Sequence, residues 1–161
     1  MVAMKTILFV LISVVSAFSF ANTLNLKDGS CAGQGTLDSG PLLPGIDFTS
    51  ERHFNKNHII AKSTVKILGF DNSATANLYF RQTDPANYLV LDLTRPMGAG
   101  YAVVGRAACS AVSCTFDATI LNGSLYLKET LVATAQGFSI FEGYQKLNGI
   151  ESRYTVNFTC R

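Results

Sequence analysis

The sequence predicts an all-β fold, a small antiparallel up-and-down β-barrel of about eight or nine strands, with a β-sandwich as the alternative. Apolar and polar residues alternate with a period of two in one short segment after another, and turn signals separate these segments. Four cysteines in a chain of 161 residues supply the means to tie such a fold together.

The N-terminal segment MVAMKTILFVLISVVSAFSFAN is typical of a secretory signal peptide. Lys5 precedes an apolar run, and the small residues Ser19 and Ala21 suit cleavage after Ala21. The run is short for a membrane span, and Cys31 lies too far from the cleavage point to carry a lipid anchor. We expect a periplasmic or extracellular protein without a membrane anchor, with a signal peptide over 1–21 and a single barrel domain over 22–161.

Charge composition narrows the range of partners. Of the 13 basic residues only Lys5 lies in the signal peptide, which leaves 12 against 11 acidic residues in the remainder of the chain. These charges are scattered, so neither nucleic acid nor an acidic membrane surface is an expected partner. We expect a monomer.

The spacing of the four cysteines favours disulfides over metal. CSAVSC, from Cys109 to Cys114, is wider than a zinc knuckle, and no histidine lies close to it in the sequence. Three pairings are open to four cysteines. We favour Cys109 with Cys114 across a hairpin tip and Cys31 with Cys160, because the second bridge makes the first and last strands neighbours and closes a barrel.

The first strand is expected over 31–38, where Gly33 and Gly35 permit a bend or a close backbone approach. Residues Ser39 to His58 form the least regular part, expected to be a long loop or lid, with a short helix or an extra strand as further options. Eight more segments of alternating pattern follow, with a turn expected at DNSA between the first two. They span 63–70, 75–82, 88–94, 101–108, 114–121, 124–134, 138–145 and 151–160.

The last segment alternates most clearly: Tyr154, Val156, Phe158 and Cys160 share one face, with polar residues on the other. Alternation alone does not say whether the apolar face points inward, so an outer-membrane barrel with its apolar face toward lipid is a further alternative. The chain has no terminal aromatic residue, and we favour the inward arrangement.

The overall arrangement resembles the lipocalins and related calycin barrels. The resemblance rests on the glycine-rich first strand CAGQGTL, the irregular segment after it, the consecutive antiparallel strands and a cysteine bridge holding the C-terminal strand. It implies a closed barrel over most of the chain and assigns no ligand residue. GRAACSAVSC and LYLKETL are also similar to segments of small exported bacterial proteins without an assigned function.

One carboxylate falls in the middle of an apolar face. Glu129 shares the parity of Leu127 and Leu131, and Glu142 repeats this pattern among Phe138, Ile140 and Tyr144. A buried carboxylate needs a partner, which Arg81, Arg106 or Arg153 could provide. Three interpretations of Glu129 stay open. It is a polar anchor inside a ligand cavity, it is turned outward by a bulge, or it belongs to a structural ion pair near the barrel mouth.

The sequence offers little for catalysis. His53 and His58 lie five residues apart, a spacing that suits neither face of one strand nor one helix, and there is no nucleophile elbow. We expect no enzyme activity, no catalytic residue, no metal site and no cofactor.

Our first functional hypothesis is an exported barrel that binds a small apolar or amphipathic ligand. The expected binding residues are Glu129, Arg106, Tyr79 and Tyr101, with Tyr88 also at the mouth. The alternative is a protein-binding module, such as an exported hydrolase inhibitor. A cavity lined by Leu and Phe beside Glu129 favours the first hypothesis, whereas a filled core with an apolar patch over Pro41–Phe48 favours the second.

Overall fold

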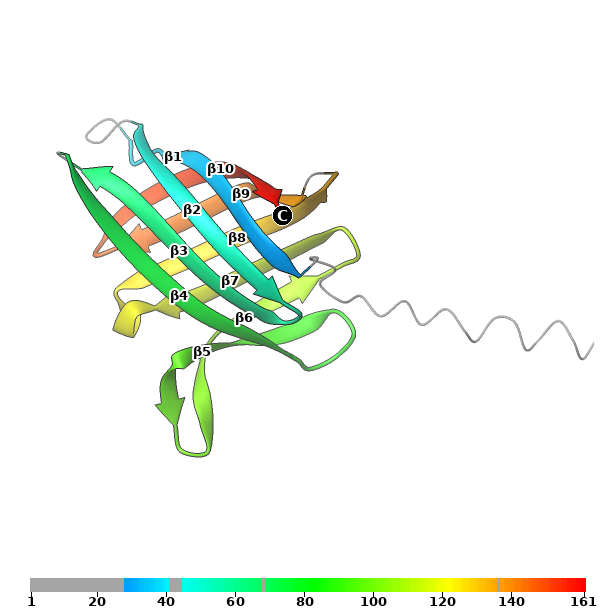
Figure 1. The fold of residues 1–161 in the computed structure, drawn as a ribbon. Helices are drawn as coiled ribbons and strands as arrows, with labels where there is room; N and C mark the ends of the chain where they lie inside the picture. Colours follow the sequence, from blue (N-terminus) through cyan, green and yellow to red (C-terminus); the bar gives the residue numbers. More distant parts are fainter. Residues whose placement is uncertain (1–27, 41–44, 68, 136) are drawn as a thin grey trace, which may run out of the picture.

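Ten antiparallel strands form one closed barrel in which each strand pairs with its neighbours in the sequence and β1 pairs with β10. The computed structural model describes residues 28–40, 45–67, 69–135 and 137–161 (Figure 1). The predicted signal peptide lies outside these residues. The strands are β1 (Gly29–Leu37), β2 (Ile46–Asn55), β3 (His58–Ile67), β4 (Phe70–Gln82), β5 (Asn87–Met97), β6 (Gly100–Cys109), β7 (Ser113–Ile120), β8 (Leu125–Thr134), β9 (Gly137–Leu147) and β10 (Ile150–Cys160), with a short 3₁₀ turn, η1 (Leu121–Gly123), between β7 and β8.

The up-and-down barrel is confirmed, and it has one strand more than the largest expected number. The additional strand is β2, within the segment expected to be a loop or lid. Its inward positions alternate as the fold requires, but they include Ser50 and Arg52 beside Phe48 and Phe54. Because these polar residues occupy inward positions, the sequence of this segment does not alternate between apolar and polar residues, and the strand was not recognised. Of the options given for the segment, only the extra strand was correct.

The turn expected at residues 71–74 lies elsewhere. β4 begins at Phe70 and pairs with β3 along DNSA, so these four residues belong to the strand. Gly69, with φ of 84°, lies between the two strands, in a conformation that glycine adopts without a steric cost.

The apolar faces point inward and fill the barrel with aromatic rings. The ring of Phe138 lies 4.9 Å from that of Phe54 and stacks at 4.3 Å on that of Phe158, while Phe80 contacts Phe116 at 5.4 Å. Each of these rings is almost completely buried. β1 lies close to β10 because Gly33 has no side chain: a Cβ there would come within 2.7 Å of the backbone oxygen of Asn157.

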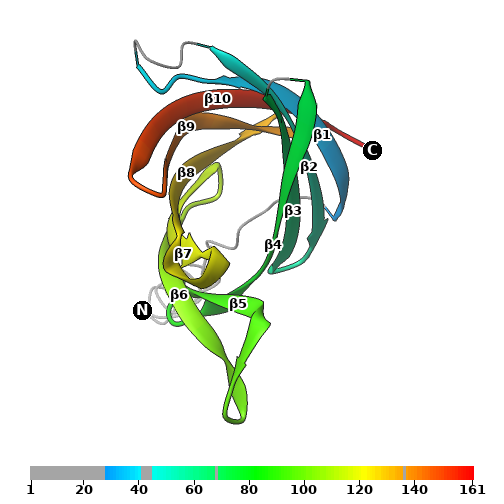
Figure 2. The same ribbon diagram turned by 90° about the vertical axis from the view of Figure 1, so that its left-hand side faces the viewer.

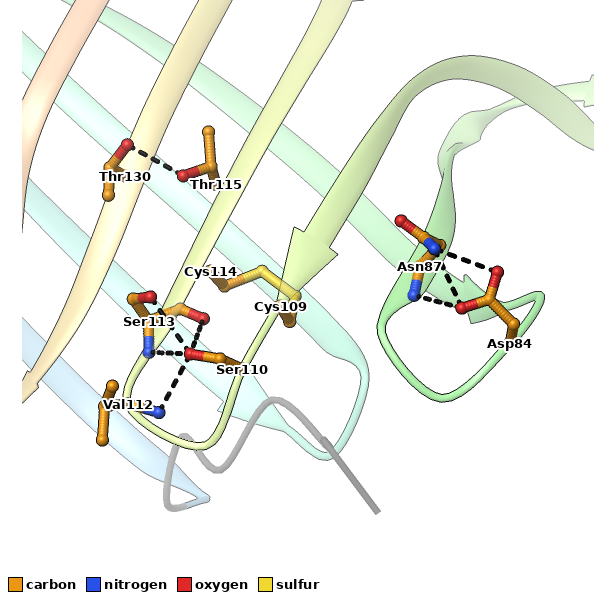
Figure 3. The surroundings of a disulfide bond; sticks show 9 residues. All are labelled: Asp84, Asn87, Cys109, Ser110, Val112, Ser113, Cys114, Thr115 and Thr130. Carbon is orange, nitrogen blue, oxygen red and sulfur yellow. Dashed lines mark hydrogen bonds between the residues drawn. A yellow bond between two sulfur atoms is a disulfide. The ribbon is translucent and has the colours of Figure 1, made fainter. Parts of the chain in front are cut away.

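Both predicted disulfides are present. Cys31–Cys160 joins β1 to β10, 129 residues apart in the sequence, within the ladder that closes the barrel. Cys109–Cys114 closes the β6–β7 hairpin, where the Ser110 hydroxyl accepts the backbone N–H of Ser113 at 3.1 Å (Figure 3).

Because the entropy that a disulfide removes from the unfolded chain grows with the logarithm of the length of the loop it closes, the two bridges are expected to contribute unequally. Replacing Cys31 and Cys160 by Ser should lower the free energy of unfolding by about 5 kcal/mol, and replacing Cys109 and Cys114 by about 2 kcal/mol. Guanidinium unfolding of the two double variants measures this difference. A greater loss from the short bridge would contradict the assignment of Cys31–Cys160 as the main closure.

Candidate functional site

A buried ion pair crosses the interior of the barrel. Arg52 on β2 and Glu129 on β8 form two parallel hydrogen bonds, Nη1 to Oε2 and Nη2 to Oε1, both 2.6 Å. The two side chains are 6% and 4% exposed. Tyr154 on β10 donates its hydroxyl to Oε1 of Glu129 at 2.7 Å. We call these three residues the cross-barrel cluster.

Gly143 allows Tyr154 to reach Glu129. The register places Glu129 opposite Gly143, and Gly143 opposite Tyr154, so the three residues lie in line across β8, β9 and β10. A Cβ on Gly143 would lie 2.4 Å from the Tyr154 ring. The ring therefore covers the space that a side chain on β9 would take, and its hydroxyl reaches the strand beyond.

The electrostatics of the cluster favour a charged arginine and a neutral tyrosine. Burial opposes the charge of Arg52, but the charge of Glu129 and its hydrogen bonds outweigh burial and raise the pKa of Arg52. Burial, followed by the nearby Glu129 charge, raises the pKa of Tyr154 well above its ordinary value. Arg52 also lies over the Phe158 ring, with Cζ 5.3 Å from the centroid.

The prediction that Glu129 faces the interior is confirmed, but its predicted partners are wrong. Arg81, Arg106 and Arg153 are exposed, and the partner is Arg52, from the segment expected to be a loop. Glu129 is therefore part of a structural ion pair whose carboxylate is already occupied by two side chains.

Glu142 does not repeat the pattern of Glu129. The register of β9 shifts between Ile140 and Glu142 against β8, and between Ile140 and Gly143 against β10, which marks a bulge around Phe141. Beyond the bulge the parity reverses, so Glu142 is exposed and Gly143 is buried. A bulge leaves no local signal that would have revealed this reversal in the sequence.

The other expected binding residues lie away from Glu129. Tyr79 and Tyr101 are 38% and 48% exposed, on the outer side of the barrel. Arg106 is exposed as well, and its backbone N–H donates to Asp117 Oδ1 at 3.1 Å. Tyr88, in contrast, is buried. The structure thus does not assemble the expected set around one cavity.

Among the residues that the structure describes, neither histidine is hydrogen-bonded to a carboxylate. His53 Nδ1 lies 3.0 Å from Ser30 Oγ, and His58 Nε2 lies 2.5 Å from Asn77 Oδ1. Within the described ranges there is no group of three or more His, Cys, Asp or Glu side chains able to hold a metal ion.

On the described part of the chain, Glu129 lines none of three pockets on the barrel, although Arg52 lines one of them. Two, of about 640 and 620 Å³, are lined mainly by outward-facing residues of β1, β2 and β3. The third, of about 210 Å³, lies between β4, β5 and η1 and is lined by Leu78, Asp92, Arg95 and Leu121 among others. All three lie outside the packed aromatic core.

The barrel wall opens between β4 and β5. These strands pair only from Leu78 to Gln82 on β4, and the β5–β6 register shifts between Asp92 and Pro96. Beyond that shift the β5–β6 hairpin projects from the barrel, as Figures 1 and 2 show. We call residues 93–101 the arm. Its exposed apolar side chains are Met97 at 65% and Tyr101 at 48%.

The ion pair can be tested by comparing single and double substitutions. Glu129→Leu leaves the buried charge of Arg52 without a partner, which is expected to lower the free energy of unfolding by about 3–5 kcal/mol. The double variant Arg52→Met, Glu129→Leu removes both charges and should recover most of that loss. Urea unfolding gives the comparison, and a double variant no more stable than Glu129→Leu would show that charge compensation is not the role of Arg52.

The raised pKa of Tyr154 predicts a loss of stability in alkali. The unfolded tyrosine ionises near pH 10, whereas the folded one keeps its proton. This contribution is fully present below pH 10 and declines as the pH rises above it. Tyr154→Phe should flatten the fall in unfolding free energy above pH 10. An unchanged pH profile in that variant would contradict the burial of a neutral phenol.

Comparison with protein-family models, with curated proteins and with solved structures finds no match for this chain. The resemblance to lipocalins therefore stays a prediction. Among the described residues, no helix is long and apolar enough to cross a membrane.

Proposed function

We propose that this is an exported binding module whose disulfide-tied barrel presents its outer surface, and above all the arm, to a protein partner. The observation that carries this proposal is the arm itself, a two-stranded projection (Figure 2) on which Met97 and Tyr101 are exposed. An isolated two-stranded ribbon is only marginally stable in water, so a contact that covers it stabilises it.

The chemistry of the arm suits a protein interface. Met and Tyr are enriched in such interfaces because they supply large contact areas that adapt to a partner. Gly98, with φ of 57°, lies in the short connection between β5 and β6, and Pro96 restricts the chain just before it. A narrow projection of this kind fits a concave surface. A substrate cleft of an exported hydrolase is such a surface, and occupying it would inhibit the enzyme.

The filled interior supports a surface function over an internal ligand. The aromatic core and the cross-barrel cluster occupy the space in which a small apolar ligand was expected, and Arg52 and Tyr154 already satisfy Glu129. The apolar patch expected over Pro41–Phe48 lies partly outside the described residues. The arm takes its place as the apolar surface in this proposal.

Export is supported by the cysteines as well as by the predicted signal peptide. All four cysteines are in disulfides, and such bridges persist in oxidising compartments.

A photo-reactive amino acid at Met97 tests the arm directly, with Val112 as the matched control. The two side chains are 65% and 66% exposed, but Val112 lies in the β6–β7 turn, away from the arm. In the native exported fraction, the probe at Met97 should attach to one protein, and the probe at Val112 should not. Met97→Ser with Tyr101→Ser should weaken binding of the captured protein at least tenfold, as expected for a central apolar contact. Equal labelling from both positions would contradict the proposal.

A further inference from the structure

Asp92 is a buried carboxylate without a counter-charge. It lies on β5 opposite Leu78 of β4 and is only 4% exposed. Its Oδ1 accepts the backbone N–H of Thr94 at 2.9 Å and the Thr94 hydroxyl at 2.6 Å. Among the described residues, its Oδ2 accepts no hydrogen bond and no basic side chain forms an ion pair with it. Glu129 differs, because Arg52 donates to both of its oxygens.

The third pocket gives access to Asp92 Oδ2. Within the described part of the chain, Arg52 Nε is the one side-chain polar atom that is both shielded from solvent and without a partner, so solvent reaches Asp92 Oδ2. Asp92 is otherwise buried, and it lines the pocket of about 210 Å³ between β4, β5 and η1. We call this the Asp92 pocket. A ligand that displaces solvent from it has to supply a positive group or a hydrogen-bond donor to Oδ2.

A second charge without a partner lines the same pocket. Arg95, also on β5, is half-buried, and its guanidinium has no hydrogen bond or ion pair among the described residues. A plain amine would meet the like charge of Arg95 here, and a plain carboxylic acid would meet that of Asp92. A ligand that carries one positive and one negative group can pair with both side chains at once.

The size of the Asp92 pocket restricts the ligand to a small molecule. Its volume is below the range of about 300–1,000 Å³ in which drug-sized ligands bind. Asp92 is the single carboxylate among its lining residues, which is too few for a divalent metal ion, since such an ion takes several oxygen ligands. Apart from the two charges, the lining is neutral: Thr75, Ala76, Leu78, Thr94, Ile120, Leu121 and Asn122.

The wall that η1 contributes has an unfavourable backbone conformation. Leu121 and Asn122 both line the pocket, and both lie in the left-handed region, with φ of 51° and 55°. This conformation is unfavourable for a residue with a Cβ atom, and least expected for a bulky one such as leucine. Backbone strain of this kind is concentrated at ligand sites.

We propose that the Asp92 pocket binds a free α-amino acid with an apolar side chain. The ammonium group donates to Asp92 Oδ2, and the carboxylate pairs with Arg95. The side chain packs against Leu78, Ile120 and Leu121. This ligand accounts for both charges and for the apolar part of the lining. It binds at the opening between β4 and β5, outside the interior that the aromatic rings fill.

Amide NMR spectra of the purified, disulfide-bonded protein test the ligand class. L-Valine and L-leucine should shift the signals of Asp92, Thr94 and Asn122 in a saturable manner. L-Valinamide lacks the carboxylate and N-acetyl-L-valine lacks the ammonium group, so each should bind at least tenfold more weakly than L-valine, because each leaves one charge of the pocket without a partner. No saturable shift with either amino acid, or equal binding of L-valine and L-valinamide, would overturn the proposal.

Substitutions separate the two charges. Arg95→Gln removes no hydrogen bond that the structure describes, so it should fold, bind L-valine at least tenfold more weakly and bind L-valinamide as the wild type does. Asp92→Asn keeps an acceptor for Thr94 and should lose binding of both compounds. Arg106→Gln is the matched control, because Arg106 is an exposed arginine of β6 that does not line the pocket. An equal loss of L-valine binding in Arg106→Gln and Arg95→Gln would overturn the assignment of Arg95.

Discussion

The central constraint on the structure is that Arg52 and Glu129 must meet, because neither buried charge can be left without the other. Each side chain is charged and buried, and such a charge is tolerated only beside its counterpart, so the pair constrains β2 and β8 to face each other across the interior. Tyr154 links β10 to this pair because its hydroxyl donates to Glu129, and Gly143 leaves the space that the Tyr154 ring needs. The absence of a side chain at Gly143 therefore allows Tyr154 to reach the Arg52–Glu129 pair.

The same cluster explains where recognition is to be sought. The interior is filled by rings and by an ion pair whose carboxylate already accepts hydrogen bonds from Arg52 and Tyr154, although Arg52 Nε has no hydrogen-bond partner among the described residues. In the proposed function, the barrel is therefore a scaffold whose binding surfaces lie outside. The wall is complete around β1, β2 and β8 to β10 but opens between β4 and β5. The arm lies on one side of that opening, and residues 70–77 of β4, which pair with β3 alone, lie on the other. The arm is an apolar projection suited to a concave partner.

The sequence was sufficient for the barrel, for both disulfides and for the inward position of Glu129. Each of these follows from a period of two or from the geometric requirement that bridged strands be neighbours. The sequence was insufficient where the alternation of apolar and polar residues does not match the inward and outward positions of the strand. Arg52 at an inward position concealed β2, and the bulge at Phe141 reversed the direction of Glu142. The opening between β4 and β5 depends on the extent of pairing between strands, which no local pattern encodes.

Residue-resolved amide hydrogen exchange on dilute protein tests the central claim most directly. Exchange reports the free energy of local opening, so strands joined to the cross-barrel cluster should exchange slowest. The account predicts strong protection in β2, β8, β9 and β10, and rapid exchange at Ser73, at Thr75 and along the arm, although Ser73, Thr75 and most of the arm are in strands. Slow exchange at Ser73, at Thr75 and along the arm, with faster exchange in β2 and in β8 to β10, would contradict it.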